Sequence, residues 1–161
     1  YAPGTSGNEF SIINTGGTNL VAVCRDNEQA TTYYNTSADL GATWSARQEI
    51  VGMGIMQMMR MRRYAGGILG FGREGKKVQG TVFTTIWYST DGVTWGRKFR
   101  PDTQGFGDAA YCDVLQRTDG KFYLMTYGGS DAAAAIRSAR SNWACRSSTD
   151  TPSSRGSIRT G

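Results

Sequence analysis

Arginine side chains stand at repeated places along this sequence and are its strongest candidates for binding an anion. Arg25 and Arg73 each follow an apolar run, and Tyr127 follows a third such run. Arg60 and Arg62 lie close together, and the chain has a formal net charge of +5. Because a positive surface attracts anionic partners, these five residues are predicted to bind a ligand, for which an acidic glycan, a lipopolysaccharide and a nucleic acid are the anionic alternatives.

Two other interpretations of the arginines stay open. They belong to an ordinary solvated surface, or they form structural ion pairs, for instance Arg25 with Asp26 and Arg73 with Glu74. Nucleic acid is the weaker partner, because the sequence contains no motif of a nucleic-acid-binding domain.

Several kinds of chemistry are disfavoured by composition. The chain has no histidine, which argues against Ser-His-Asp and Cys-His catalysis and against most zinc sites. Its three cysteines, Cys24, Cys112 and Cys145, lack the spacing of metal ligands, so we expect small buried side chains, with one disulfide as the alternative. No metal and no cofactor is predicted. No apolar stretch approaches ~20 residues, so no membrane span is predicted either.

One signature occurs twice. Residues 37–44 read S-A-D-L-G-A-T-W, and residues 89–95 read S-T-D-G-V-T-W, the same pattern shortened by one residue. The aspartates suit acceptance of turn amides, the glycines supply the turn conformation, and each tryptophan is expected to enter the next strand and pack on the sheet. The residues to which we assign this structural role are Ser37, Asp39, Gly41, Thr43, Trp44, Ser89, Asp91, Gly92, Thr94 and Trp95.

The two signatures resemble Asp boxes, the repeats of sialidase-like (BNR) β-propellers. A third repeat keeps a serine and a tryptophan, Trp143, in residues 138–143. In that family the box lies on the periphery of a blade, away from the active site. The resemblance therefore predicts the fold and leaves the activity open.

The rest of each repeat predicts short strands and an all-β fold. Turn pairs occur at residues 16–17, 66–67 and 119–120, and each lies between two candidate strands. First strands are expected at residues 10–14, 58–64 and 111–116, and second strands at 20–24, 68–71 and 122–125. Third strands are expected at 31–36, 81–88 and 132–138, and a fourth strand is expected to start at each of Trp44, Trp95 and Trp143.

These repeats predict about three four-stranded blades of a sialidase-like β-propeller, at residues 9–50, 55–101 and 106–148, with a polar tail at 149–161. Known propellers close with roughly four to eight blades. We therefore expect either a homo-oligomer that completes the ring or a chain that is part of a longer protein.

The resemblance also suggests where catalysis would take place. Sialidases bind the substrate carboxylate with three arginines and use a Tyr/Glu nucleophile pair with an Asp acid/base. Arg60, Tyr111 and Asp113 lie on or before predicted first strands, which line a propeller's channel, and are the candidate catalytic residues. The family's Phe/Tyr-Arg-Ile-Pro motif is absent, and no glutamate stands in the nucleophile-activating position. A two-carboxylate glycosidase using Asp108 and Asp113 is a further alternative.

Three functions follow from this resemblance. The first is a carbohydrate-recognition propeller, such as the receptor-binding part of a phage tail or a secreted surface protein, at an extracellular or virion surface. The second is a sialidase-type glycosidase with an incomplete catalytic set in this chain. The third is a scaffold propeller for protein partners.

Methionines gather in one segment. Five of the six in the chain are Met53, Met56, Met58, Met59 and Met61. We expect them to fill the core at the entrance of the second blade, with an adaptable binding surface as the alternative.

Overall fold

The structure, a computed structural model, describes residues 9–26, 31–75, 82–100, 112–119, 121–128 and 135–141. Strands and the turns between them make up these residues, and no helix occurs among them. The prediction of an all-β fold is therefore confirmed.

The strands form three antiparallel sheets in which neighbours along the chain are neighbours in the sheet. The first contains β1 (Phe10–Gly16), β2 (Asn19–Asp26), β3 (Thr31–Ser37) and β4 (Gln48–Glu49). The second contains β5 (Met56–Tyr64), β6 (Gly67–Glu74), β7 (Phe83–Ser89) and β8 (Gly96–Phe99). The third contains β9 (Cys112–Gln116), β10 (Phe122–Gly128) and β11 (Ala135–Ser141).

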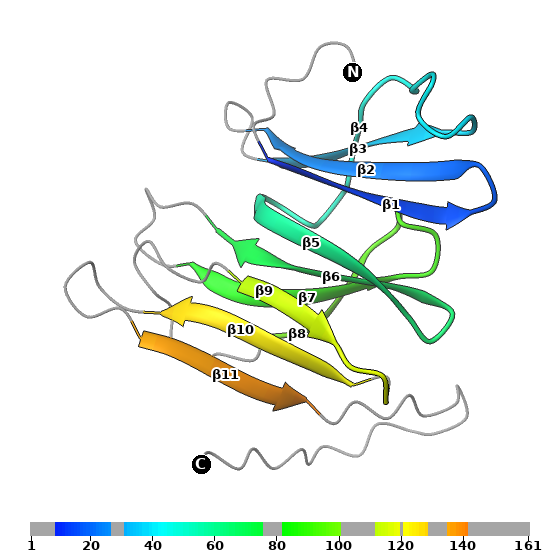
Figure 1. The fold of residues 1–161 in the computed structure, drawn as a ribbon. Coiled ribbons are helices and arrows are strands. Elements are labelled where there is room, and N and C mark those ends of the chain that lie inside the picture. Colours follow the sequence, from blue (N-terminus) through cyan, green and yellow to red (C-terminus); the bar gives the residue numbers. More distant parts are fainter. Residues whose placement is uncertain are drawn as a thin grey trace, which may run out of the picture.

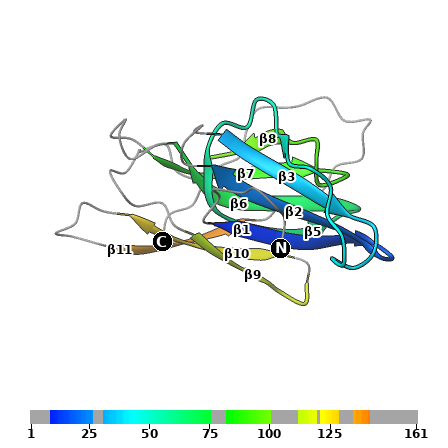
Figure 2. The ribbon, with the colours of Figure 1, turned by 90° about the horizontal axis from the view of Figure 1, so that it is seen from above.

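The sheets are stacked face to face in chain order (Figure 1). Their first strands meet, because β5 contacts both β1 and β9. Seen from above, β1, β5 and β9 lie toward one edge of the stack, and β3 and β8 lie toward the other (Figure 2). This is the arrangement of propeller blades, with the first strand of each blade innermost. We refer to the three sheets as blades 1, 2 and 3.

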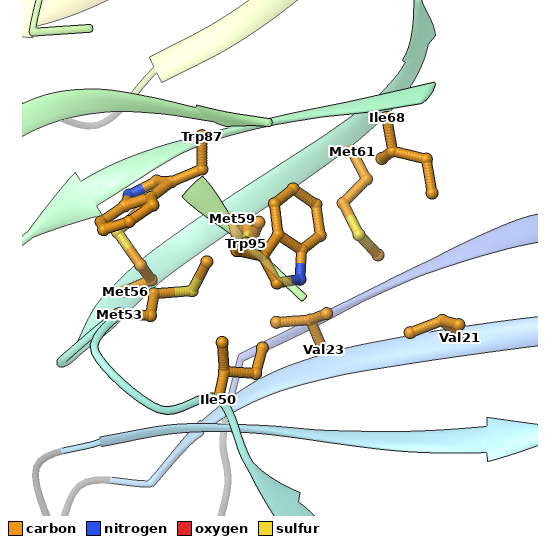
Figure 3. Packing of buried hydrophobic residues seen from close by; sticks show 10 residues of the cluster. All are labelled: Val21, Val23, Ile50, Met53, Met56, Met59, Met61, Ile68, Trp87 and Trp95. Atoms are coloured by element: carbon orange, nitrogen blue, oxygen red, sulfur yellow. The ribbon is translucent and has the colours of Figure 1, made fainter. Parts of the chain in front are cut away.

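Blades 1 and 2 enclose the first apolar core (Figure 3). Four methionines, Met53, Met56, Met59 and Met61, are at most 5% exposed there and pack with Trp95 and with valines of β2. The expectation that the methionines fill the core is confirmed for these four. Met58, the fifth, is half-buried and has a φ of 51°.

Blades 2 and 3 enclose the second core. Phe71 on β6 and Phe122 on β10 are buried, with ring centroids 5.7 Å apart, and Tyr64 meets Phe122 edge-on at 5.3 Å. Val114 of β9 completes the contact from the innermost strand of blade 3. Since one core lies on each face of blade 2, its second strand β6 is buried along almost its whole length.

The fourth strands differ from the prediction. β4 begins at Gln48 and has two residues, so it does not start at Trp44, and β8 begins at Gly96, one residue after Trp95. The reason in blade 1 is Ser45, whose hydroxyl accepts the Thr36 N–H at 3.0 Å in place of a backbone carbonyl. This side-chain bond interrupts the regular ladder, which resumes at Gln48. Trp143 lies outside the described residues.

The predicted blade bounds stay predictions. The strands described in the three sheets fall within residues 9–50, 55–101 and 106–148. The predicted tail at 149–161 lies outside the described residues.

Close packing at the start of β6 leads to a first prediction. A Cβ placed on Gly67 would lie 2.6 Å from the Ser89 carbonyl oxygen and 2.6 Å from the Tyr88 ring. Gly67→Ala is therefore expected to lower the free energy of unfolding by about 1–3 kcal/mol, because backbone has to shift. Gly96→Ala is the matched control, since nothing lies within 4 Å of a Cβ there. Denaturant titration measures both, and equal midpoints would contradict the packing described.

Candidate functional site

Charged and polar side chains gather where β1, β5 and β9 begin, which we call the strand-start end. Glu9 directly precedes β1, and its carboxylate lies 3.1 Å from the Arg25 guanidinium on β2. The backbone N–H of Arg25 also donates to the Glu9 carbonyl at 3.2 Å. Arg25 alternates with the buried Val21 and Val23, so this ion pair faces blade 2.

Blade 2 repeats the arrangement with a neutral partner. Arg73 on β6 is 4% exposed and donates to the side-chain oxygen of Gln57 on β5. The Gln57 amide in turn donates to the Gly75 carbonyl at 2.8 Å. Arg73 alternates with Leu69 and Phe71, so this pair faces blade 3. At each of these two blade interfaces a guanidinium thus meets a side-chain oxygen from the start of the innermost strand or from the residue before it.

A β-bulge in β5 decides which way the residues after Gln57 point. Gln57 pairs with Arg73 and Arg60 pairs with Phe71, so β5 advances three residues while β6 advances two. Residues three apart on β5 therefore share a face, and Arg60 lies on the same side as Gln57. The bulge is held from blade 1, because the Glu9 carboxylate accepts the Met58 N–H at 2.9 Å.

Arg60 and Arg62 both face blade 3. They are cross-strand partners of Phe71 and Leu69, which belong to the core against blade 3, and directly opposed residues share a face. Both side chains are half-buried. The Arg62 guanidinium donates to the Met61 carbonyl at 2.9 Å. Arg60 lies near the Cys112 thiol at the start of β9, close enough to favour its ionised form.

The other predicted site residues are placed differently. Asp113 is exposed and accepts the Val114 N–H at 2.8 Å. It alternates along β9 with Cys112 and Val114, which pack against blade 2, so its side chain faces away from Arg60. Tyr127 belongs to β10, but its side chain lies outside the described part of the structure, as does all of Tyr111.

The ion pairs that hold Asp26 and Glu74 involve arginines that the sequence did not single out. The buried Asp26 lies 2.8 Å from Arg47, and Glu74 lies 3.1 Å from Arg100. Each of these arginines also stacks on an aromatic ring from the third strand of its own blade. Arg47 lies 4.5 Å from the centroid of Tyr33 on β3, and Arg100 lies 4.1 Å from the centroid of Phe83 on β7. The proposed pairing of Arg25 with Asp26 is corrected, because the ion pair described for Arg25 is with Glu9.

The two box turns, residues 37–44 and 89–95, lie at the opposite end of their sheets from Glu9. In the first, the Asp39 carboxylate accepts the backbone N–H of Thr43 at 2.8 Å and its hydroxyl at 2.5 Å. Ser37 donates to Asp39 and accepts the Gly41 N–H, and the Trp44 indole donates to the Gly41 carbonyl. These bonds lower the pKa of Asp39 to about 2, with the Thr43 hydroxyl as the largest cause.

The second turn is one residue shorter and makes a similar set of bonds. The Asp91 carboxylate accepts the N–H groups of Val93 and Thr94, Ser89 binds both Asp91 and the Gly92 N–H, and the Trp95 indole donates to the Gly92 carbonyl. Burial by itself raises the pKa of Asp91, but these hydrogen bonds outweigh it and the pKa is lowered. Both turns are built as hydrogen-bonded clasps at the outer edge, and none of their groups points to the strand-start end.

The described cysteines form neither a disulfide nor a metal site. Cys24 and Cys112 are free thiols, and Cys145 lies outside the described residues. Burial is the main cause that raises the pKa of Cys24 and raises that of Cys112 to about 12. Within the described residues no three acidic or cysteine side chains gather as a metal site, and no helix there is long and apolar enough to cross a membrane.

Sequence reasoning missed Glu9 and Gln57. Each stands sixteen residues before an arginine that it contacts, Arg25 and Arg73. That equal spacing was the available signal, because it marks cross-strand neighbours at the same place in two repeats. The same spacing separates Tyr111 from Tyr127.

Comparison with known proteins identifies the architecture. No protein family and no curated protein matches the sequence. Solved structures do match. A GH43 endo-arabinanase from Bacillus licheniformis has a TM-score of 0.57 at 16% identity, covering 86% of this chain and 54% of that one. A family 117 glycoside hydrolase from the marine bacterium Zobellia galactanivorans has a TM-score of 0.56 at 13% identity, covering 84% and 51%.

A third match is an exo-β-1,3-galactanase from Phanerochaete chrysosporium, with a TM-score of 0.58 at 13% identity over 88% of this chain and 36% of that one. The fold is that of a partial β-propeller. This chain spans about half the length of the first two proteins. At identities this low, the likeness concerns the fold alone.

The first box turn leads to a pH prediction. The pKa of Asp39 is about 2 in the folded chain against an ordinary value of 3.8, so ionised Asp39 stabilises the fold above about pH 4. That stabilisation is lost as the pH falls toward 2. Asp39→Asn is therefore expected to show a shallower fall of melting temperature between pH 4 and pH 2 than the unmodified chain. Parallel melting curves, or an Asp39 pKa near 4 by carboxyl NMR, would contradict the hydrogen bonding described.

Proposed function

We propose that this chain is part of a carbohydrate-recognition β-propeller whose glycan lies across the strand-start end of β1, β5 and β9. The observation that supports it most is the row of hydrogen-bonding groups fixed there, Glu9 with Arg25 and Gln57 with Arg73. Glu9 and Arg25 keep 20% and 14% of their side-chain surface exposed and are fixed in place, so they can orient a sugar's hydroxyls at little entropic cost. The buried Gln57 and Arg73 hold the strands behind them. The matching solved structures carry names of glycan-degrading enzymes, which supports the same ligand class.

Glycoside hydrolysis is the second candidate, favoured by those same neighbours. Hydrolysis generally needs two carboxyl groups about 5–9.5 Å apart on either side of the bond to be cleaved. Among the described residues near β1, β5 and β9, Glu9 is already bound to Arg25 and to the Met58 N–H, and Asp113 faces away from blade 2. We therefore place recognition before hydrolysis.

A sialidase-type enzyme is the narrower form of this second candidate. It rests on the resemblance of the box turns, and it needs arginines available to the substrate carboxylate. Arg25 and Arg73 are bound to Glu9 and Gln57, so such an enzyme would depend on Arg60 and Arg62 and on residues other than those described. The candidate roles of Arg60, Tyr111 and Asp113 in catalysis, and of Tyr127 in binding, stay predictions.

A scaffold for protein partners is the third candidate, and it has no observation of its own. A location outside the cell or on a virion also stays a proposal, since the structure tests neither. The two locations belong to the proposal of a glycan receptor, such as part of a phage tail or a secreted surface protein.

The function is tested by incubating the chain with immobilised neutral and acidic polysaccharides and measuring both retention and released reducing sugar. We expect retention without release, because fixed hydrogen-bonding groups are present and the carboxylates near them are engaged. Release of sugar would replace recognition by hydrolysis. Neither retention nor release on any polysaccharide would contradict both and favour the scaffold.

We further propose that additional blades complete the ring, supplied by a second copy or by the rest of a longer chain. Phe10 and Ile12 on the free face of blade 1 are 67% and 48% exposed, and Leu115 on the free face of blade 3 is 66% exposed. Apolar faces of this kind are usually covered. For the 161-residue chain alone, we expect a native mass of twice that of the chain, and a monomer after Phe10→Asp with Ile12→Asp. A monomer without these substitutions would contradict the second copy.

A further inference from the structure

Most described arginines already have a partner that explains them. Arg25, Arg47, Arg100 and Arg117 each form an ion pair with a carboxylate. Arg73 is bound to Gln57, and the exposed Arg63 donates to the Asn14 carbonyl of blade 1. Arg62 donates to the carbonyl of its own neighbour Met61. Among the residues that the structure describes, neither Arg60 nor Arg62 has a carboxylate partner or a contact with another blade's carbonyl.

These two arginines are placed as a pair. They are two residues apart on one strand, which separates them by about 6.6 Å along its axis, and both face blade 3. Each is half-buried, so its charge has given up part of its water, and no described carboxylate supplies a counter-ion. The neighbouring Cys112 thiol does not supply the missing charge, because burial raises its pKa to about 12 and keeps it neutral at pH 7.

The pair lies on the middle blade's innermost strand, which contacts the innermost strand of each neighbouring blade. A polymer lying across the innermost strands would therefore pass beside it. A guanidinium presents a planar fork of donors that matches the oxygens of a carboxylate or a sulfate. Two such forks in a row suit anionic groups that recur along one polymer.

We propose that Arg60 and Arg62 bind the oxyanion groups of an acidic glycan, carboxylate or sulfate. This inference rests on the proposed function and narrows its ligand class. Of the other two arginines that the sequence put forward, Arg25 is held by Glu9 and Arg73 is buried against Gln57, so neither is part of this pair.

Glu9 acts here as a positioning residue. Its carboxylate accepts the Met58 N–H at the bulge, and the bulge puts Arg60 and Arg62 on the blade 3 side. Without the bulge, the alternation of β5 would turn both arginines toward the apolar core against blade 1. Glu9 thus acts on Arg60 and Arg62 through the backbone of β5.

Matched polysaccharides test the proposal on the whole chain. Polygalacturonate is compared with its methyl-esterified form, and dextran sulfate with dextran, so that each pair differs in its charged groups. We expect tighter binding of at least one charged form. The double variant Arg60→Gln with Arg62→Gln is expected to lose about tenfold or more in affinity for it and to keep its binding of neutral polysaccharides.

Arg117→Gln with Lys121→Gln is the charge-matched control, because these two exposed residues flank the β9–β10 turn and both are paired with Asp119. If the control weakens binding as much as the Arg60 and Arg62 variant does, the effect is net charge alone and the proposal is overturned. Equal binding of charged and neutral forms overturns it too, while leaving carbohydrate recognition standing.

Absence of all glycan binding overturns the proposed function itself. Binding of single-stranded DNA in preference to every glycan assigns the pair to another polymer and overturns the ligand class.

The role of Glu9 is tested with two substitutions. Glu9→Ala removes the acceptor of the Met58 N–H and is expected to lower affinity for the charged polysaccharide to the level of the double arginine variant. Glu9→Gln keeps an acceptor oxygen and is expected to restore affinity, even where its weaker bond to Arg25 lowers the melting temperature. Full affinity in Glu9→Ala, or no rescue by Glu9→Gln, would overturn the positioning role.

Discussion

One carboxylate oxygen of Glu9 connects blades 1 and 2 and determines which way the side chains of β5 point. It takes the Arg25 guanidinium of its own blade and the Met58 N–H of the next blade within 3.1 Å. The amide it accepts sits in the bulge of β5, where the ladder with β6 shifts by one residue. Everything that β5 presents after that point depends on this shift, because side chains on a strand alternate strictly between two faces.

The consequence is a division of β5 between two neighbours. Met59 and Met61 enter the core against blade 1, while Arg60, Arg62 and Tyr64 face blade 3. The glycines of β6 follow from the same division. A Cβ at Gly70 would collide with the Met59 methyl group. The Met59 side chain therefore has its place in the core because β6 has no side chain at position 70.

Polar contacts recur at equal places in blades 1 and 2, and this recurrence gives the stack its order. At each interface a guanidinium on the second strand meets an oxygen from the first strand. Within each blade a carboxylate at the end of the second strand holds an arginine that stacks on a third-strand ring. The apolar cores supply most of the stabilisation, while these contacts fix the register in which the blades meet.

The sequence revealed the strands well, because glycine turn pairs and apolar runs recur with a period near 50 residues. It placed the fourth strand of blade 1 too early, since nothing local shows that the Ser45 hydroxyl takes the place of a backbone carbonyl. It also predicted the arginines without separating the bound ones from the available ones. That separation depends on Glu9 and Gln57, which only strand pairing brings to Arg25 and Arg73.

The two box turns differ by one residue and still share the bonds of their serine and tryptophan side chains and the bond from the threonine N–H to the aspartate. Leu40 is the additional residue, and it is exposed with a φ of 56° while the clasp closes around it. The first turn accommodates an added residue and keeps these bonds, so the length of the turn can change while the strands on either side keep their positions. Loops there are free to lengthen during evolution, and the tip of the first turn offers a position for inserting a reporter peptide without disturbing the stack.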